Sequence, residues 1–157
     1  MALFSCGDAV VHPLHGAGYI RALETRRVDG VEKIYYCIHL VISDLVIHVP
    51  AGQDKIGLRP VCSAQQAEQL LRRMPDMPIE NDKVWNQRYR DNMLRIRSGQ
   101  MEQVACVVKN LLYRQKKKPL STGEKNVLES ALSILISELM LALDRPYGEI
   151  RRALETA

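Results

Sequence analysis

The residues best suited to chemistry lie between positions 81 and 99, in the stretch NDKVWNQRYRDNMLRIRSG. Trp85 is the only tryptophan of the chain, and four arginines follow it within twelve residues: Arg88, Arg90, Arg95 and Arg97. An indole ring can stack on nucleic-acid bases or wedge between them, and guanidinium groups neutralise phosphates. The stretch therefore predicts a helix that faces a negatively charged partner with stackable rings.

A core role for the same stripe of residues is also open. At about 100° per residue, Trp85, Tyr89, Met93 and Ile96 share one stripe, and the arginines lie on both of its flanks. Such a stripe is typical of a helix packed on a core, with arginine stems lying over the apolar edge. Because Trp85 falls in the first turn, it can protrude while the other three side chains pack inward. A buried anchor and a nucleic-acid contact both remain possible from spacing alone.

Positive charge gathers in one block of the chain. The formal net charge is +4, but residues 83–118 alone hold ten basic and two acidic residues, whereas residues 1–60 hold six of each. A block of this kind is expected of a protein that binds a polyanion, although a solvated helical surface has the same composition. Within the block, the run YRQKKKP adds Arg114 and three lysines to the candidate phosphate contacts.

Signals of catalysis or metal binding are weak. The chain has no phosphate-binding loop, no G-x-S-x-G and no H-E-x-x-H. A zinc set of Cys6, His12, His15 and Cys37 matches no common ligand spacing. We therefore predict no enzymatic activity, no metal and no cofactor. Four cysteines without a C-x-x-C pair indicate reduced thiols, and we find neither a signal peptide nor an apolar run of membrane-spanning length, so we expect a cytoplasmic protein.

The elements that would position these residues begin with strands. The first 60 residues contain four runs rich in Val, Ile, Tyr and Leu, and Asp29-Gly30 between two of them is a strong hairpin signal. Gly16 and Gly18 are expected where the backbone bends. Four or five short strands in so few residues predict a small, strongly bent barrel.

Helices follow Pro60. The predicted N-caps are Ser63, Asn81 or Asp82, and Ser121, where STGE has the pattern of a capping box with Glu124. Ser98-Gly99 is expected to end the helix of Trp85, and Pro146 to begin a last amphipathic segment. The central core helix is predicted from one apolar stripe: Leu128, Leu132, Leu135, Ile136, Leu139, Met140 and Leu143. The predicted class is α+β, with a β module at 1–60 and an all-α domain at 61–157.

Several longer segments of the sequence resemble a known family. Three segments, GDAVVHPLHGAGYI, ALETRRVDG and HVP before GLRPV, are similar to the amino-terminal module of CarD-type transcription regulators. That module is related to the polymerase-binding module of transcription-repair coupling factors (TRCF). WNQRYRDNMLRIRSGQMEQVACVVKNL and LSTGEKNVLESALSILISELMLAL resemble that family's helical domain. The likeness covers about residues 5–145. It implies a Tudor-like barrel that docks on the β subunit of bacterial RNA polymerase and a helical domain that reaches promoter DNA near the −10 region.

The resemblance also implies roles for single residues. The family's wedging Trp falls on Trp85, and its contacts with the DNA backbone fall on Arg88, Arg90 and Lys125. To these we add Arg97 and Arg114 from the charge pattern. The contacts expected with RNA polymerase are Arg26 and His48. His48 stands where the family has Arg, Val84 where it has Asn, and His12 where it has Tyr.

We expect from these observations a monomer that stabilises the open promoter complex without enzymatic activity. The barrel would dock on polymerase, and the helical domain would contact DNA without sequence preference, with Trp85 as a wedge in the minor groove. Two alternatives remain open. The chain could be a protein–protein interaction adaptor, or it could bind RNA generally through its basic segment.

Overall fold

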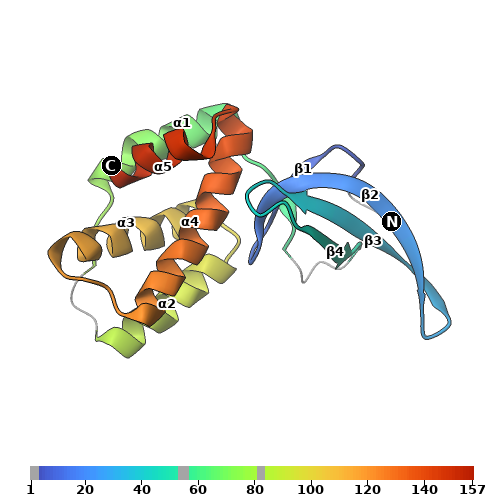
Figure 1. Cartoon of the computed structure of the whole chain (residues 1–157), viewed down its shortest axis with the longest axis horizontal. Helices are drawn as coiled ribbons and strands as arrows, with labels where there is room; N and C mark the ends of the chain where they lie inside the picture. Colours follow the sequence, from blue (N-terminus) through green and yellow to red (C-terminus); the bar gives the residue numbers. More distant parts are fainter. Residues whose placement is uncertain (1–3, 53–56, 81–83) are drawn as a thin grey trace.

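The structure is a computed structural model of the 157-residue chain, and it describes residues 4–52, 57–80 and 84–157. Strands come first and helices follow, as the α+β prediction requires. Figure 1 shows the strands as a curved ribbon on one side and the helices as a separate layer on the other, joined near one end of α4. The proposed division at residues 60 and 61 stays a prediction.

The strand region is an antiparallel sheet in the order β4-β3-β2-β1-β5. Its strands are β1 (Ala9–His12), β2 (Gly16–Val28), β3 (Val31–Leu40), β4 (Val46–Pro50) and β5 (Arg59–Pro60). The predicted hairpin at Asp29-Gly30 is confirmed, and both residues have positive φ, 52° and 76°. A two-residue turn of this kind matches the right-handed twist of the flanking strands, so β2 and β3 pair along their length.

The predicted barrel is not observed among the described residues. No ladder joins β4 to β5 in the part of the chain that the structure describes, so the sheet has two edges. β5 has only two residues, and the β2–β3 ribbon continues past its neighbours instead of curling back on them (Figure 1). The apolar side of the sheet nevertheless has its own core, made of Val10, Ile20, Tyr36, Ile38, Leu40 and Val49.

The helices build a second and larger core. They are α1 (Ala64–Arg73), the short 3₁₀ turn η2 (Met74–Asp76), α2 (Trp85–Arg97), α3 (Met101–Lys117), α4 (Thr122–Leu143) and α5 (Tyr147–Glu155). Ser63 caps α1 in a full capping box with Gln66, and Gly99 follows α2 with φ of 73°. The alternative caps for α2, Asn81 and Asp82, lie outside the described residues. Val84 occupies the N-cap position of α2 and forms no side-chain capping bond.

α4 is the central helix, as its leucine stripe predicts. Leu128, Leu132, Leu135 and Leu139 are each at most 3% exposed. By length and composition α4 could cross a membrane, so the expectation that no apolar run reaches that length is wrong. More than half of its apolar segment is buried inside the protein, and a buried core helix has the same composition. The hydropathy of α4 is therefore accounted for by the core.

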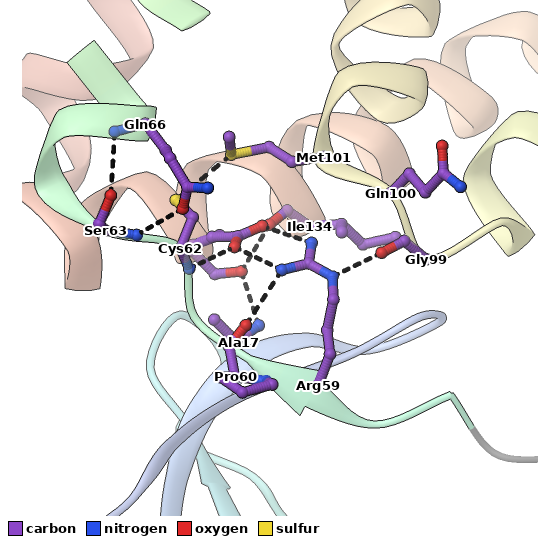
Figure 2. Close-up of polar contacts among 12 residues, drawn as sticks. Ala17, Arg59, Pro60, Cys62, Ser63, Gln66, Gly99, Gln100, Met101 and Ile134 are labelled. Atoms are coloured by element: carbon purple, nitrogen blue, oxygen red, sulfur yellow. Dashed lines mark hydrogen bonds and ion pairs between the residues drawn. The ribbon is translucent and has the colours of Figure 1, made fainter. Parts of the chain in front are cut away.

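A polar clamp fastens the sheet to α4 (Figure 2). Arg59 of β5 donates two hydrogen bonds, of 2.6 and 2.7 Å, to Glu138, which also accepts one of 2.9 Å from the Cys62 N–H. At the preceding residue of α4, the buried Ser137 hydroxyl accepts a hydrogen bond of 2.8 Å from the Ala17 N–H. Sequence reasoning missed both acceptors because they sit among leucines. Buried charge is tolerated here because every oxygen of Glu138 has a donor.

Gly16 and Gly18 both lie where a side chain would clash, but with different neighbours. Gly16 has φ of 87°, and a Cβ there would lie 2.7 Å from the Ser137 hydroxyl. A Cβ on Gly18 would lie 2.3 Å from the carbonyl oxygen of His39 on the neighbouring strand. The predicted bends are thus places of close approach, where the sheet meets α4 and where β2 meets β3.

Candidate nucleic-acid interface

The indole of Trp85 is at the first residue of α2 and is 43% exposed. It stacks on Tyr89, one turn further along, with ring centroids 5.5 Å apart and planes 14° apart. Its Nε1–H points to the hydroxyl of Ser121 at 3.4 Å, and its Cζ2 lies against Gly123. The prediction that this ring projects from the helical core is confirmed. The ring is held in place by contacts with the start of α4, yet it keeps an accessible face.

Grooves run along both sides of this ring. The first lies between α2, the end of α3 and the start of α4, and the second lies along α2 itself. Both combine aromatic surface with cations. The first is lined by Trp85, Arg88, Tyr113, Arg114, Lys117, Lys118, Pro119, Ser121 and Glu124. The second is lined by Trp85, Asn86, Tyr89, Arg90, Met93, Leu94 and Arg97.

The cations around Trp85 fall into two groups. Arg90, Arg97 and Lys125 are exposed and available to a phosphate. Arg88 and Arg114 instead face the buried carboxylate of Glu124, at 3.5 and 3.9 Å. Their side chains are only 15% and 32% exposed. Arg88 and Arg114 therefore help to join α2 and α3 to α4, in addition to any contact with DNA.

The predicted capping box at STGE is only half formed. The Ser121 hydroxyl accepts from the Glu124 N–H at 3.2 Å, but among the described residues no bond returns from the Glu124 side chain to the Ser121 N–H. Glu124 is 6% exposed, and its carboxylate turns to the two arginines instead. The attraction of two cations outweighs one capping bond at this position.

The apolar stripe of α2 is part buried and part exposed, and Tyr89 is in the exposed part. Ile96 is 4% exposed and Met93 packs on the helical core, but Tyr89 is 40% exposed and lies with Trp85 on the surface. Tyr89 therefore does not pack inward with Met93 and Ile96, which the spacing had left possible. The reason is that the first turn of α2 extends past the end of the core, so two successive aromatic positions remain accessible.

The two predicted polymerase contacts lie on the outer face of the sheet. Arg26 pairs with Glu24 at 3.1 Å and lies over the ring of Tyr35, while His48 approaches the same carboxylate at 3.9 Å. Beneath them is the buried thiol of Cys37, the strand partner of His48. Hydrogen bonds from Arg26 and from Cys37 hold the pKa of Glu24 below its usual range. Arg26 and His48 thus belong to one charged patch.

Comparison with known proteins shows the family. The family model described as CarD, C-terminal domain, matches residues 69–155, and the one described as CarD-like/TRCF RID domain matches residues 4–62. The chain belongs to the CarD family. A Bacillus subtilis (strain 168) protein named "Putative transcription factor YdeB" is 32% identical over 138 residues, which are 87% of this chain and 90% of that protein.

Membership of the CarD family determines the general kind of protein. Both models describe transcription-factor types, not enzymes, and the RID type interacts with RNA polymerase. The CarD-family chain is therefore a transcription-related protein of a polymerase-interacting type. The DNA roles of Trp85, Arg88, Arg90, Arg97, Arg114 and Lys125, and the docking roles of Arg26 and His48, stay predictions.

Proposed function

We propose that this protein is a cytoplasmic, monomeric regulator that stabilises the open promoter complex of bacterial RNA polymerase. The sheet docks on the polymerase β subunit through the patch of Arg26 and His48. The helical region contacts promoter DNA at the upstream edge of the melted −10 region. The observation that carries this proposal is the accessible Trp85 ring, backed by Tyr89 and set between two grooves lined with cations.

The tether makes weak DNA contacts sufficient. Docking on polymerase raises the effective concentration of the helical region at the promoter, so a few phosphate contacts add to an affinity already provided by the sheet. The exposed Arg90, Arg97 and Lys125 supply contacts that do not depend on sequence. Recognition of the bubble then comes from its shape and from the position of the tether.

The wedge acts on DNA that is already distorted. Unstacking a base step costs a few kcal/mol, and least where the pair is already open. A Trp85 ring held by Tyr89, Ser121 and Gly123 loses little conformational freedom when it inserts. Insertion fills the space into which the upstream edge of the bubble would close, so bubble closure slows.

The lifetime of the open complex tests the wedge. Trp85→Ala should shorten it several-fold while polymerase binding stays unchanged, because the substitution removes the wedging ring and leaves the sheet that docks on polymerase untouched. Gln87→Ala is the matched control, since Gln87 is exposed on the same first turns of α2 and lines neither groove. A lifetime unaltered by Trp85→Ala would refute the wedge.

A separate binding experiment tests the docking patch. Immobilised polymerase β lobe should retain the wild-type chain and lose Arg26→Glu, which reverses a charge on the outer face of the sheet. Arg27→Glu is the matched control, because Arg27 is exposed on the neighbouring position of β2 and its side chain alternates to the other face. Equal retention of both variants would contradict docking through Arg26.

General RNA binding is the second candidate, and the grooves beside Trp85 favour it too. They offer stacking surfaces and cations that any single strand can use. Competition of a promoter bubble with duplex DNA and with single-stranded RNA separates the two functions. Preference for the bubble supports the promoter role, and equal or stronger binding of RNA supports the alternative. An adaptor role would leave all three nucleic acids unbound.

A further inference from the structure

Three side chains of metal-ligating types converge on the outer face of the sheet. Glu24 on β2, Cys37 on β3 and His48 on β4 place one carboxylate oxygen, the thiol and one imidazole nitrogen within 4.8 Å of one another. Cys37 and His48 are direct partners across the β3–β4 ladder. Glu24 and Cys37 are 13 positions apart in the sequence, and Cys37 and His48 are 11 apart, so no common metal-binding motif identifies them.

We infer that Glu24, Cys37 and His48 form a binding site for a divalent cation of the Zn²⁺ class. Carboxylate, thiolate and imidazole are the ligands that zinc takes in proteins, and the thiolate disfavours Mg²⁺ and Ca²⁺. Bonds of about 2.0–2.3 Å in a tetrahedral arrangement place ligand atoms roughly 3.3–3.8 Å apart. Glu24 and His48 are exposed and Cys37 is buried, so small rotations of the two exposed side chains can bring their ligand atoms to these distances from the thiol.

The site leaves a fourth position open. Three protein ligands with access to solvent accept a water molecule or a side chain of a bound partner. The thiol must release its proton to the solvent as the Cys37–metal bond forms. Burial, and then the neighbouring Glu24, raise the pKa of the Cys37 thiol, while Arg26 and Arg21 lower it. A cation seated beside Cys37 and Glu24 favours the thiolate.

Metal binding would change the charged patch that surrounds the site. Arg26 now pairs with Glu24 at 3.1 Å, with each side chain 47% exposed. A dication on the same carboxylate repels the guanidinium, and Arg26 has room to turn to solvent. This consequence rests on the proposed docking function: occupied protein should bind polymerase more weakly than metal-free protein, because His48 is engaged and Arg26 is displaced.

Titration of the full-length, tag-free chain tests the site directly. Zn²⁺ competes with a chromophoric chelator for the protein, and Co²⁺ reports thiolate ligation by a sulfur-to-metal charge-transfer band. We expect one equivalent of metal, and an affinity at least about tenfold lower in Cys37→Ser and in His48→Gln. His39→Gln and Cys106→Ser are matched controls outside the cluster and should bind as the wild type does.

The results that would overturn the site are equally specific. Wild-type affinity in both Cys37→Ser and His48→Gln, or a Co²⁺ complex without the sulfur band, excludes it. His48→Gln covers the case in which Cys37→Ser fails to fold, since His48 is exposed and Cys37 is buried. Polymerase binding with and without Zn²⁺ tests the consequence. If the chain does not bind polymerase at all, the docking proposal fails and the metal titration still decides the site.

Discussion

At the scale of single residues, Trp85 has a fixed position without being buried. Tyr89 stacks on one face of the indole, and the Ser121 hydroxyl accepts a hydrogen bond from the indole N–H. The edge of the ring lies beside Gly123, which has no side chain, yet 43% of Trp85 remains exposed. A side chain that is both held in place and accessible loses little conformational entropy when it contacts a partner. The neighbouring arginines are of two kinds: Arg90 and Arg97 are exposed, whereas Arg88 and Arg114 are paired with Glu124.

Two charge reversals should separate these arginines. Arg90→Glu removes an exposed cation, so we expect the slope of log affinity for DNA against log salt to fall by about one, with stability unchanged. Arg88→Glu should instead destabilise the fold by on the order of 3 kcal/mol, because it places a second acid beside the nearly buried Glu124. Filter-binding titrations and urea unfolding measure the two effects. Equal stability of both variants would contradict the structural role of Arg88.

His12 should make the stability depend on pH. Burial, and then repulsion by His15, lower the pKa of His12 from 6.5 to about 4, and its Nδ1 accepts from the Leu14 N–H at 3.1 Å. The unfolded chain therefore binds this proton more tightly than the folded chain, and stability falls as pH drops from about 6.5 to about 4. Because His12 is half-buried, we expect the loss to stay below about 3 kcal/mol.

Urea unfolding at pH 7 and pH 4.5 measures this contribution of His12. His12→Gln should lose less stability between the two pH values than the wild type does. His39→Gln is the control, since His39 lies at the surface, with its Nε2 3.1 Å from the Asp44 carboxylate. An identical pH dependence of His12→Gln and the wild type would show that His12 titrates normally.

At the scale of elements, close backbone approach decides which glycines matter. A Cβ on Gly18 of β2 would lie 2.3 Å from the His39 carbonyl oxygen, which is too close for any side chain. A Cβ on Gly148 of α5 would have no atom within 4 Å. The two positions look alike in the sequence, since each lies beside a Tyr. Only the strand pairing distinguishes them.

Alanine substitution at these positions should have opposite effects. Gly18→Ala should destabilise the sheet by several kcal/mol, because a Cβ 2.3 Å from a ladder carbonyl forces β2 and β3 apart. Gly148→Ala should raise stability by up to about 1 kcal/mol, since alanine favours a helix over glycine. Thermal unfolding followed by circular dichroism measures both. Tolerance of Gly18→Ala would show that the two strands are further apart than described.

At the scale of the whole molecule, the clamp of Arg59 and Glu138 joins the sheet to the central helix. Glu138 is 1% exposed and accepts from both Arg59 and Cys62, and the Arg59 Nε also donates to the Gly99 carbonyl after α2 (Figure 2). One guanidinium thus contacts the sheet strand that carries it, α4 and the end of α2. The clamp therefore links the end of the Trp85 helix to the sheet through α4.

Removal of the clamp should weaken the whole fold. Glu138→Ala leaves the partly buried Arg59, whose side chain is 28% exposed, without its counter-ion, so we expect a loss of about 3 kcal/mol. Glu129→Ala, which removes an exposed partner of Arg151, should cost less than about 1 kcal/mol. The midpoint of urea unfolding measures both. A small effect of Glu138→Ala would show that the two parts keep their arrangement without this pair.

Local patterns in the sequence were sufficient for much of the fold. The α+β class, the Asp29-Gly30 turn, the Ser63 cap, the end of α2 at Gly99 and the core stripe of α4 depend on residues close together in the chain. Such signals act within one turn or one hairpin, so they are readable without knowledge of the partners. Closure of the sheet depends on whether distant strands meet, and the described residues do not show the closed barrel that was predicted.

The sequence by itself determined the family, the basic block and the presence of one tryptophan at a helix start. Only the tertiary structure decided that Tyr89 joins Trp85 at the surface, that Glu124 binds two arginines, and that Glu138 fastens the sheet to α4. It alone also brought Glu24, Cys37 and His48 together. The physical reason is that charge pairing and burial depend on distances through space, and these distances arise only when separate elements pack against one another.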